Sequence, residues 1–152
     1  LGQLKQQSIE DYYRFILDRW QLMRPAIHYS LSVAEHLGQH RIAFDSRLDH
    51  AIINLLNNAA DASPEHIDLW ISLDDKDLIW TISDAGTGIQ GTVLEVLGKS
   101  AITTKDNGLG LGMLLSHTTI NRYGGSVTQT ANRPQGTITT IRLPLNGPTG
   151  PA

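Results

Sequence analysis

The chain has 152 residues, of which 40% are hydrophobic and 18% are charged, proportions typical of a globular domain rather than a disordered one. The formal net charge is −3 and no basic block occurs, so nucleic acid is not an expected partner. The chain has no cysteine, which excludes disulfides and thiolate metal sites. No apolar run approaches the roughly 20 residues that a membrane span needs.

The first 24 residues follow the spacing of an amphipathic helix. Apolar side chains recur every three to four positions, close to a heptad seam, at Ile9, Tyr12, Tyr13, Ile16, Trp20 and Met23. Pro25 ends this pattern, because proline disfavours helical backbone at the residue before it. We therefore separate residues 1–24 from a main domain at 25–145.

The main domain alternates between strand and helix patterns. Strands are expected at residues 26–34, 41–44, 67–73, 78–82, 126–131 and 137–143. Helices are expected at about 46–62 and 109–123, the first capped by Ser46 and closed by Pro64. Strands mixed with a few helices indicate an α/β sandwich with helices on one face of the sheet. Residues 146–152 are expected to form a disordered tail.

The helix expected at 46–62 carries polar side chains at the edge of its apolar stripe. That stripe comprises Leu48, Ala51, Ile52, Leu55, Leu56, Ala59 and Ala62, and it must face the core. Asn54, Asn58 and Asp61 lie within about 60° of one another at its border. An asparagine oxygen suits Mg²⁺, which prefers oxygen ligands and keeps several waters. One carboxamide plus nucleotide phosphates would complete such a site, and plain surface asparagines are the alternative.

A glycine-containing turn follows the strand that ends near Ser83. Its sequence is Asp84-Ala-Gly86-Thr-Gly88-Ile, and glycines let the backbone approach a flat ligand closely. The Asp84 carboxylate can accept a hydrogen bond from an amino group such as that of adenine. An ordinary Asp-x-Gly turn is the alternative.

A second glycine-rich segment, Gly108-Leu109-Gly110-Leu111-Gly112, opens the last helix. Free N–H groups and the positive dipole end at a helix N-terminus favour phosphate, and Lys105 could add a positive charge. No P-loop motif occurs. The segment does not follow a strand of a βαβ unit, which argues against a dinucleotide-binding fold.

Together and in this order, the motifs resemble those of the gyrase/Hsp90/histidine-kinase/MutL ATP-binding superfamily. The corresponding segments are the N box at 54–62, the G1 box at 84–89, Thr103-Thr104-Lys105 at the end of the ATP lid, the G2 box at 108–112 and a terminal strand motif at 136–144. The resemblance covers roughly residues 26–145. It implies an α+β Bergerat fold: an α/β sandwich whose mixed, mostly antiparallel sheet is covered on one face by helices and preceded by an N-terminal helix.

The resemblance also implies ATP and Mg²⁺ as cofactors, with Asn58 as the metal ligand. Asn54 would contact the phosphate end of the nucleotide, and Asp84 would recognise the adenine amino group. Asn54, Asn58 and Lys105 would be the catalytic residues. Further nucleotide contacts are implied at Asp61, Gly86, Gly88, Thr104, Lys105, Gly108, Leu109, Gly110, Leu111 and Gly112.

Within the superfamily, the residues favour a protein-histidine kinase. ATPase branches carry a glutamate as general base four residues before the magnesium asparagine, and Asn54 stands there instead. Slow hydrolysis is therefore expected, whereas phosphoryl transfer needs mainly positioning and charge neutralisation. The run 96–105 is similar to the RegB/PrrB subgroup. Two departures stand out: Ser100 and Ala101 replace the F-box residues, which predicts a loose lid, and Asp61 replaces a common lysine.

None of the six histidines stands in a phosphoacceptor motif; they are His28, His36, His40, His50, His66 and His117. The resemblance therefore implies a phosphoacceptor histidine on a separate dimerisation domain, with relay to a response regulator. Residues 1–24 resemble the second helix of such a dimerisation/phosphotransfer domain, with a plain packing helix as the alternative. The expected location is the cytoplasm, as a fragment of a membrane-anchored sensor, with no membrane contact by the fragment itself.

Two other functions stay open on the sequence. One is an ATPase clamp of the Hsp90 or MutL kind. The other is a nucleotide-binding module that transfers no phosphate, or a kinase that acts on protein serine, which the missing F box supports.

Overall fold

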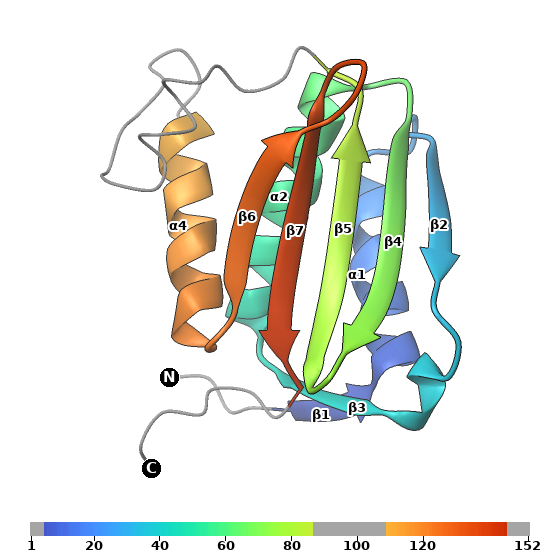
Figure 1. The fold of residues 1–152 in the computed structure, drawn as a ribbon, viewed down its shortest axis with the longest axis vertical. Coiled ribbons are helices and arrows are strands. Elements are labelled where there is room, and N and C mark those ends of the chain that lie inside the picture. The colour runs from blue at the N-terminus through green and yellow to red at the C-terminus, as the bar shows by residue number, and fades with distance from the viewer. Residues whose placement is uncertain (1–4, 87–108, 146–152) are drawn as a thin grey trace.

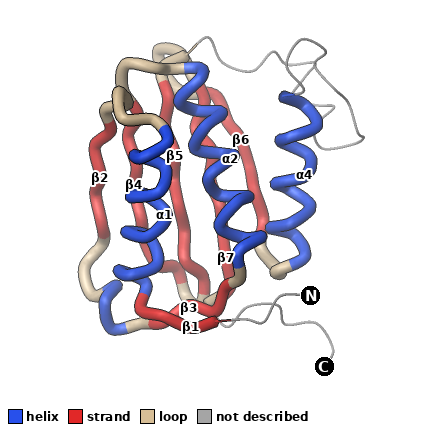
Figure 2. The backbone as a smooth tube through the Cα atoms, turned by 180° about the vertical axis from the view of Figure 1, so that it is seen from behind, coloured by secondary structure: helices blue, strands red, loops and turns tan. Residues whose placement is uncertain are grey.

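The computed structural model describes residues 5–86 and 109–145. A five-stranded sheet has the order β2-β4-β5-β7-β6, in which β2 and β4 are parallel and all other neighbours are antiparallel. The strands are β2 (Tyr29–Val33), β4 (Ile67–Asp74), β5 (Asp77–Asp84), β6 (Ser126–Ala131) and β7 (Thr137–Pro144). Three helices, α1 (Ile9–Met23), α2 (Ser46–Ala62) and α4 (Leu109–Arg122), cover one face of this sheet (Figures 1 and 2). The predicted α+β sandwich with a mixed, mostly antiparallel sheet is confirmed.

A second, two-stranded sheet lies across one end of the sandwich (Figure 1). It pairs β1 (Lys5–Ser8) with β3 (Arg41–Phe44) in antiparallel register, and a 3₁₀ turn at Leu37–Gln39 precedes β3. Ala43 N–H also donates to Leu145 O at 2.9 Å, so the end of β7 is tied to β3. The prediction that residues 5–8 belong to the first helix is wrong, because they form β1 and the helix begins only at Ile9.

Alternating burial explains the central hairpin. Every second residue of β5 is buried, and in the first half of β4 the same alternation appears, which places one set of side chains under the helices. Asp75 in the connecting turn has a positive φ of 57°, a conformation that aspartate tolerates better than most residues. The hairpin predicted from alternating apolar residues is therefore confirmed.

Helix α1 belongs to the same hydrophobic core as the sheet and α2. Ile9, Tyr12, Ile16 and Trp20 are each 0% exposed and lie in one cluster with the buried residues of the sheet. The near-heptad spacing of these residues thus accompanies packing inside a core shared with the sheet and α2. The resemblance of residues 1–24 to a helix of a dimerisation/phosphotransfer domain stays a prediction.

Helix α2 is capped by Asp45, and the prediction that Ser46 caps it is wrong. Asp45 Oδ1 accepts hydrogen bonds from the backbone N–H of Arg47 at 2.9 Å and of Leu48 at 3.3 Å. Ser46 is the first residue of the helix. Asp and Ser are similarly good N-cap residues, so the sequence alone does not decide which of the two neighbours caps the helix.

Asp49, in the first turn of α2, is a buried carboxylate. It is 3% exposed, and its Oδ1 has no hydrogen-bond partner among the described residues. Burial raises the pKa of Asp49 to about 6, although the positive charge of Arg19 opposes that rise. The folded state therefore holds this proton more tightly than the unfolded chain does.

We expect Asp49→Asn to raise the free energy of unfolding at pH 7.5 by about 1–3 kcal/mol, because a pKa raised by about two units costs up to about 1.4 kcal/mol per unit when the group is ionised. The stabilising contribution of the protonated carboxyl is complete below pH 4 and is lost as the pH rises through 6. Urea unfolding at pH 4.5 and 7.5 checks this, with the exposed Asp18→Asn as control. A variant that is less stable than wild type at pH 7.5 would contradict it.

Candidate functional site

Three element ends that carry the sequence motifs meet at one end of the domain (Figure 1). Asp84 ends β5, Asn54 and Asn58 lie in the second half of α2, and residues 109–112 form the first turn of α4. Helices α2 and α4 also pack against each other. The fold therefore brings motifs that are far apart in the sequence to a single region.

Asp84 is a buried carboxylate, 5% exposed, with a fixed orientation. Its Oδ1 accepts hydrogen bonds from the backbone N–H of Gly86 at 3.0 Å and of Thr137 at 3.1 Å. Both of these donors reach the same oxygen, Oδ1. Such a carboxylate can accept a further hydrogen bond from the amino group of a ligand.

The connection between β6 and β7 holds the backbone beside Asp84. Asn132 Nδ2 donates to Asp84 O at 2.8 Å, and Gln135 Nε2 donates to Ala85 O at 2.8 Å. Gly136 has a φ of 110°, and a Cβ there would lie 2.0 Å from Asp84 O, so only glycine fits. Sequence reasoning did not single out Asn132 and Gln135, because no motif marks their contacts across about 50 residues.

Gly86 joins the same turn to the end of α2. A Cβ at Gly86 would lie 2.5 Å from Ala62 O and 2.8 Å from Ala62 Cβ. Asn58 precedes Ala62 by one helical turn and shares its side of α2. Asn58 is half-buried, and Asn54, one turn earlier, is exposed. The carboxylate of β5 and the asparagines of α2 therefore border the same region.

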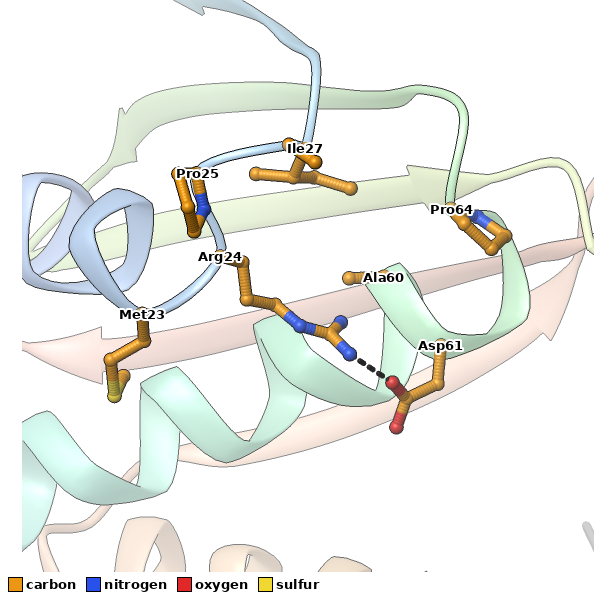
Figure 3. A pocket seen from close by; sticks show the side chains of 8 residues that line it. Met23, Arg24, Pro25, Ile27, Ala60, Asp61 and Pro64 are labelled. Atoms are coloured by element: carbon orange, nitrogen blue, oxygen red, sulfur yellow. Dashed lines mark hydrogen bonds and ion pairs between the residues drawn. The ribbon is translucent and has the colours of Figure 1, made fainter.

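Asp61, also predicted to contact nucleotide, has a protein partner in the structure. It forms an ion pair with Arg24, which follows the C-terminal end of α1. An open cavity of about 380 Å³ lies beside this pair, between the ends of α1 and α2, and includes Met23, Ile27 and Ala60 in its lining (Figure 3). The role of Asp61 as a nucleotide contact stays a prediction.

Several predicted site residues lie outside the described residues: Gly88, Thr104, Lys105 and Gly108. The same holds for the lid, for Ser100 and Ala101, and for residues 146–152. Leu109, Gly110, Leu111 and Gly112 fall in the first turn of α4, where a helix offers unpaired backbone N–H groups. Their contacts with nucleotide stay predictions.

Comparison with known proteins identifies the family. Residues 44–147 match the model of the histidine kinase-, DNA gyrase B-, and HSP90-like ATPases, a span that includes α2, Asp84 and α4. The chain belongs to this family. Because the family is one of ATPases, ATP is the ligand that its site binds.

Relatives of this ATPase domain include sensor kinases from several bacteria. Sporulation kinase A of Bacillus subtilis is 31% identical over 101 residues, which cover 65% of this chain and 17% of that kinase. The C4-dicarboxylate transport sensor protein DctB of Rhizobium meliloti is 34% identical over 101 residues, 64% of this chain and 16% of that protein. The chain thus spans less than a fifth of either relative.

Solved structures share the fold of this ATPase domain. The catalytic domain of histidine kinase ThkA superposes with a TM-score of 0.77 at 20% identity, covering 95% of this chain and 97% of that one. The mycobacterial sensor histidine kinase MprB superposes with a TM-score of 0.74 at 22% identity, covering 94% and 98%. Among the residues that the structure describes, no helix has the length and apolarity to cross a membrane.

We expect Gly86→Ala to weaken nucleotide binding by tenfold or more, because the added Cβ would push the turn away from Ala62 O. Overpacking of this kind also costs about 1–3 kcal/mol of stability. Nucleotide titration and thermal melting check both effects.

Gly38→Ala is the matched control, since a Cβ there would meet only Glu10 Oε1 at 3.9 Å. If both variants bind nucleotide equally, the contact between the turn and α2 does not shape the site.

Proposed function

We propose that this chain is the ATP-binding catalytic domain of a two-component sensor histidine kinase. It transfers the γ-phosphoryl group of ATP to a histidine on a separate dimerisation domain, and a response regulator then receives the phosphate. The supporting observation is the convergence of a fixed carboxylate, Asp84, with the asparagine-bearing side of α2 through the contact of Gly86 with Ala62.

In this proposal, adenine is recognised at Asp84. Two backbone N–H groups hold Oδ1, and Oδ2 is the proposed acceptor of a hydrogen bond from the exocyclic amino group of the purine. The close approach of backbone at Gly86 and Gly136 to Ala62 O and Asp84 O holds the turn that carries this carboxylate in place.

Asn58 is the proposed Mg²⁺ ligand. Within residues 5–86 and 109–145, no three His, Cys, Asp or Glu side chains gather closely enough to hold a metal ion. A carboxamide oxygen together with phosphate oxygens and water is an ordinary set of Mg²⁺ ligands, and Asn58 lies on the side of α2 that Gly86 contacts. When bound, Mg²⁺ would supply charge neutralisation on the phosphates. Asn54, Lys105 and the first turn of α4 are the proposed supports of the phosphates.

The positions of the carboxylates of α2 favour a function in phosphoryl transfer over the hydrolysis of ATP by a clamp-type ATPase. Asp61 is tied to Arg24, and Asp49 is buried near Tyr12 and Arg19 of α1. Asn54 occupies the position one turn before Asn58, and an amide is no general base. A histidine nucleophile needs no such base, because a neutral imidazole is already nucleophilic.

We further propose that the dimerisation domain belongs to the same kinase and that the full protein is a membrane-anchored sensor whose catalytic domain lies in the cytoplasm. Relatives named as two-component sensors and sensor histidine kinases support this view. The RegB/PrrB-like subgroup stays a prediction from the run 96–105.

We expect Asp84→Asn to fold like wild type yet to bind Mg²⁺-ATP about 10- to 100-fold more weakly. The amide oxygen can still accept from Gly86 and Thr137, but an NH₂ group replaces the second acceptor, and a lost hydrogen bond to a charged group costs about 1.5–3 kcal/mol. Calorimetry with millimolar Mg²⁺ measures the affinity. Wild type that binds no adenine nucleotide would refute the proposed function.

Labelled ATP and a purified dimerisation domain distinguish the remaining functions. Acid-labile, base-stable label on histidine is the expected result. Steady multi-turnover hydrolysis by the chain alone would instead indicate an ATPase clamp. Acid-stable label would indicate transfer to serine, and tight binding without any label would indicate a module that transfers no phosphate.

A further inference from the structure

We propose that Trp20 and Arg24 of the α1 segment are positioning residues for the Mg²⁺-phosphate half of the nucleotide site. They act through α2 and touch neither nucleotide nor metal. This inference rests on the proposed function of Asn58 as the metal ligand, and its basis is a set of three hydrogen bonds that tie the end of α1 to the N box.

The first tie joins Trp20 to Asn57. The indole of Trp20 is fully buried, and its Nε1 donates to Asn57 Oδ1 at 3.1 Å. Because an indole N–H can only donate, the bond fixes which way the carboxamide of Asn57 points. Asn57 is the residue immediately before Asn58, so the bond is made within the N box itself.

Arg24 adds the other two ties. Its Nη1 donates to Asn57 O at 3.3 Å, and its Nη2 pairs with the Asp61 carboxylate. One guanidinium thus bridges the main chain at Asn57 and a side chain one turn later. A positive charge is also favourable near the C-terminal end of α2, where the helix dipole is negative.

These polar ties matter because apolar packing is incomplete at this junction. The open cavity of about 380 Å³ lies between the ends of α1 and α2, with Arg24 and Asp61 in its lining (Figure 3). Met23, the last residue of α1, is 56% exposed. The three hydrogen bonds therefore add to the packing of the buried Leu56 and Ala60 in holding the rotation of α2 about its own axis.

The consequence for the site follows from helix geometry. Asn57 and Asn58 lie about 100° apart around α2, so a bond on Asn57 from the α1 side fixes the direction in which the Cα–Cβ bond of Asn58 leaves the helix. Asp84 is held independently, by the N–H groups of Gly86 and Thr137. Loss of the ties should therefore weaken the metal-dependent part of binding and spare recognition of adenine.

Two variants test this inference: Trp20→Phe, which keeps a smaller aromatic ring and removes the donor, and Arg24→Met, which removes two of the hydrogen bonds at a partly exposed site. Each should weaken Mg²⁺-ATP binding about tenfold, at the lower end of what loss of a supporting partner costs a metal site. Affinity for adenosine without Mg²⁺ should stay within about twofold of wild type. Calorimetry at 25 °C supplies both affinities, and thermal melting confirms that each variant is folded.

Arg14→Met is the matched control, because Arg14 makes an exposed ion pair with Glu10 on the same helix. It should leave both affinities unchanged. If Trp20→Phe fails to fold, Arg24→Met alone decides. Wild-type affinity for Mg²⁺-ATP in a folded Arg24→Met variant would overturn the inference, and so would an equal loss of Mg²⁺-ATP and adenosine binding. Wild-type protein that binds neither ligand would refute the proposed function instead.

Discussion

The backbone of the turn after β5 approaches the end of α2 so closely at Gly86 that any side chain would strike Ala62 O, 2.5 Å from the position of its Cβ. On the other side of the same turn, Gly136 meets Asp84 O just as closely. The turn is thus held between α2 and β7 by steric fit, and the two N–H groups on Asp84 Oδ1 fix its carboxylate there. Under the proposed function, this spacing is what lets a sheet residue and a helix residue share one ligand.

Helices α1 and α2 are joined differently at the two ends of α2. Near the N-terminal end of α2, Asp45 caps the helix and Asp49 is buried close to Tyr12 of α1, in a region of continuous core. At the C-terminal end, a cavity replaces part of that packing, and hydrogen bonds from Trp20 and Arg24 connect α1 to α2.

Sequence patterns predicted those features that depend on neighbours along the chain. Alternating apolar residues predicted the β4–β5 hairpin, helical periodicity predicted α2, and the ordered motifs indicated the family. Predictions were poorer where two local structures have similar energies. Asp45 and Ser46, for example, are both good N-cap residues, and the wrong one was predicted. The apolar repeat of α1 fits a coiled coil and a core-packed helix equally well, because both need one apolar stripe.

What the sequence could not supply were contacts between residues far apart in the chain. Nothing in the sequence pairs Arg24 with Asp61, 37 residues away, or places Asn132 against Asp84 O, 48 residues away. Such pairs depend on how helices and turns meet in the folded state. Gly86 and Asn58 could be recognised from their motifs, whereas the residues that hold those motifs in place belong to no motif.

The distribution of charge on α2 bears on the choice between hydrolysis and transfer. This helix carries three carboxylates, Asp49, Asp61 and its cap Asp45; the cap bonds Arg47 and the first N–H groups, and the other two are engaged with or buried beside α1. The side of α2 that continues toward Gly86 bears carboxamides instead. Carboxamides can orient phosphates and a cation but cannot take a proton from water. Under the proposed function, the domain therefore binds ATP without hydrolysing it quickly. The phosphoryl group is transferred only when a nucleophile that needs no general base from α2 is present.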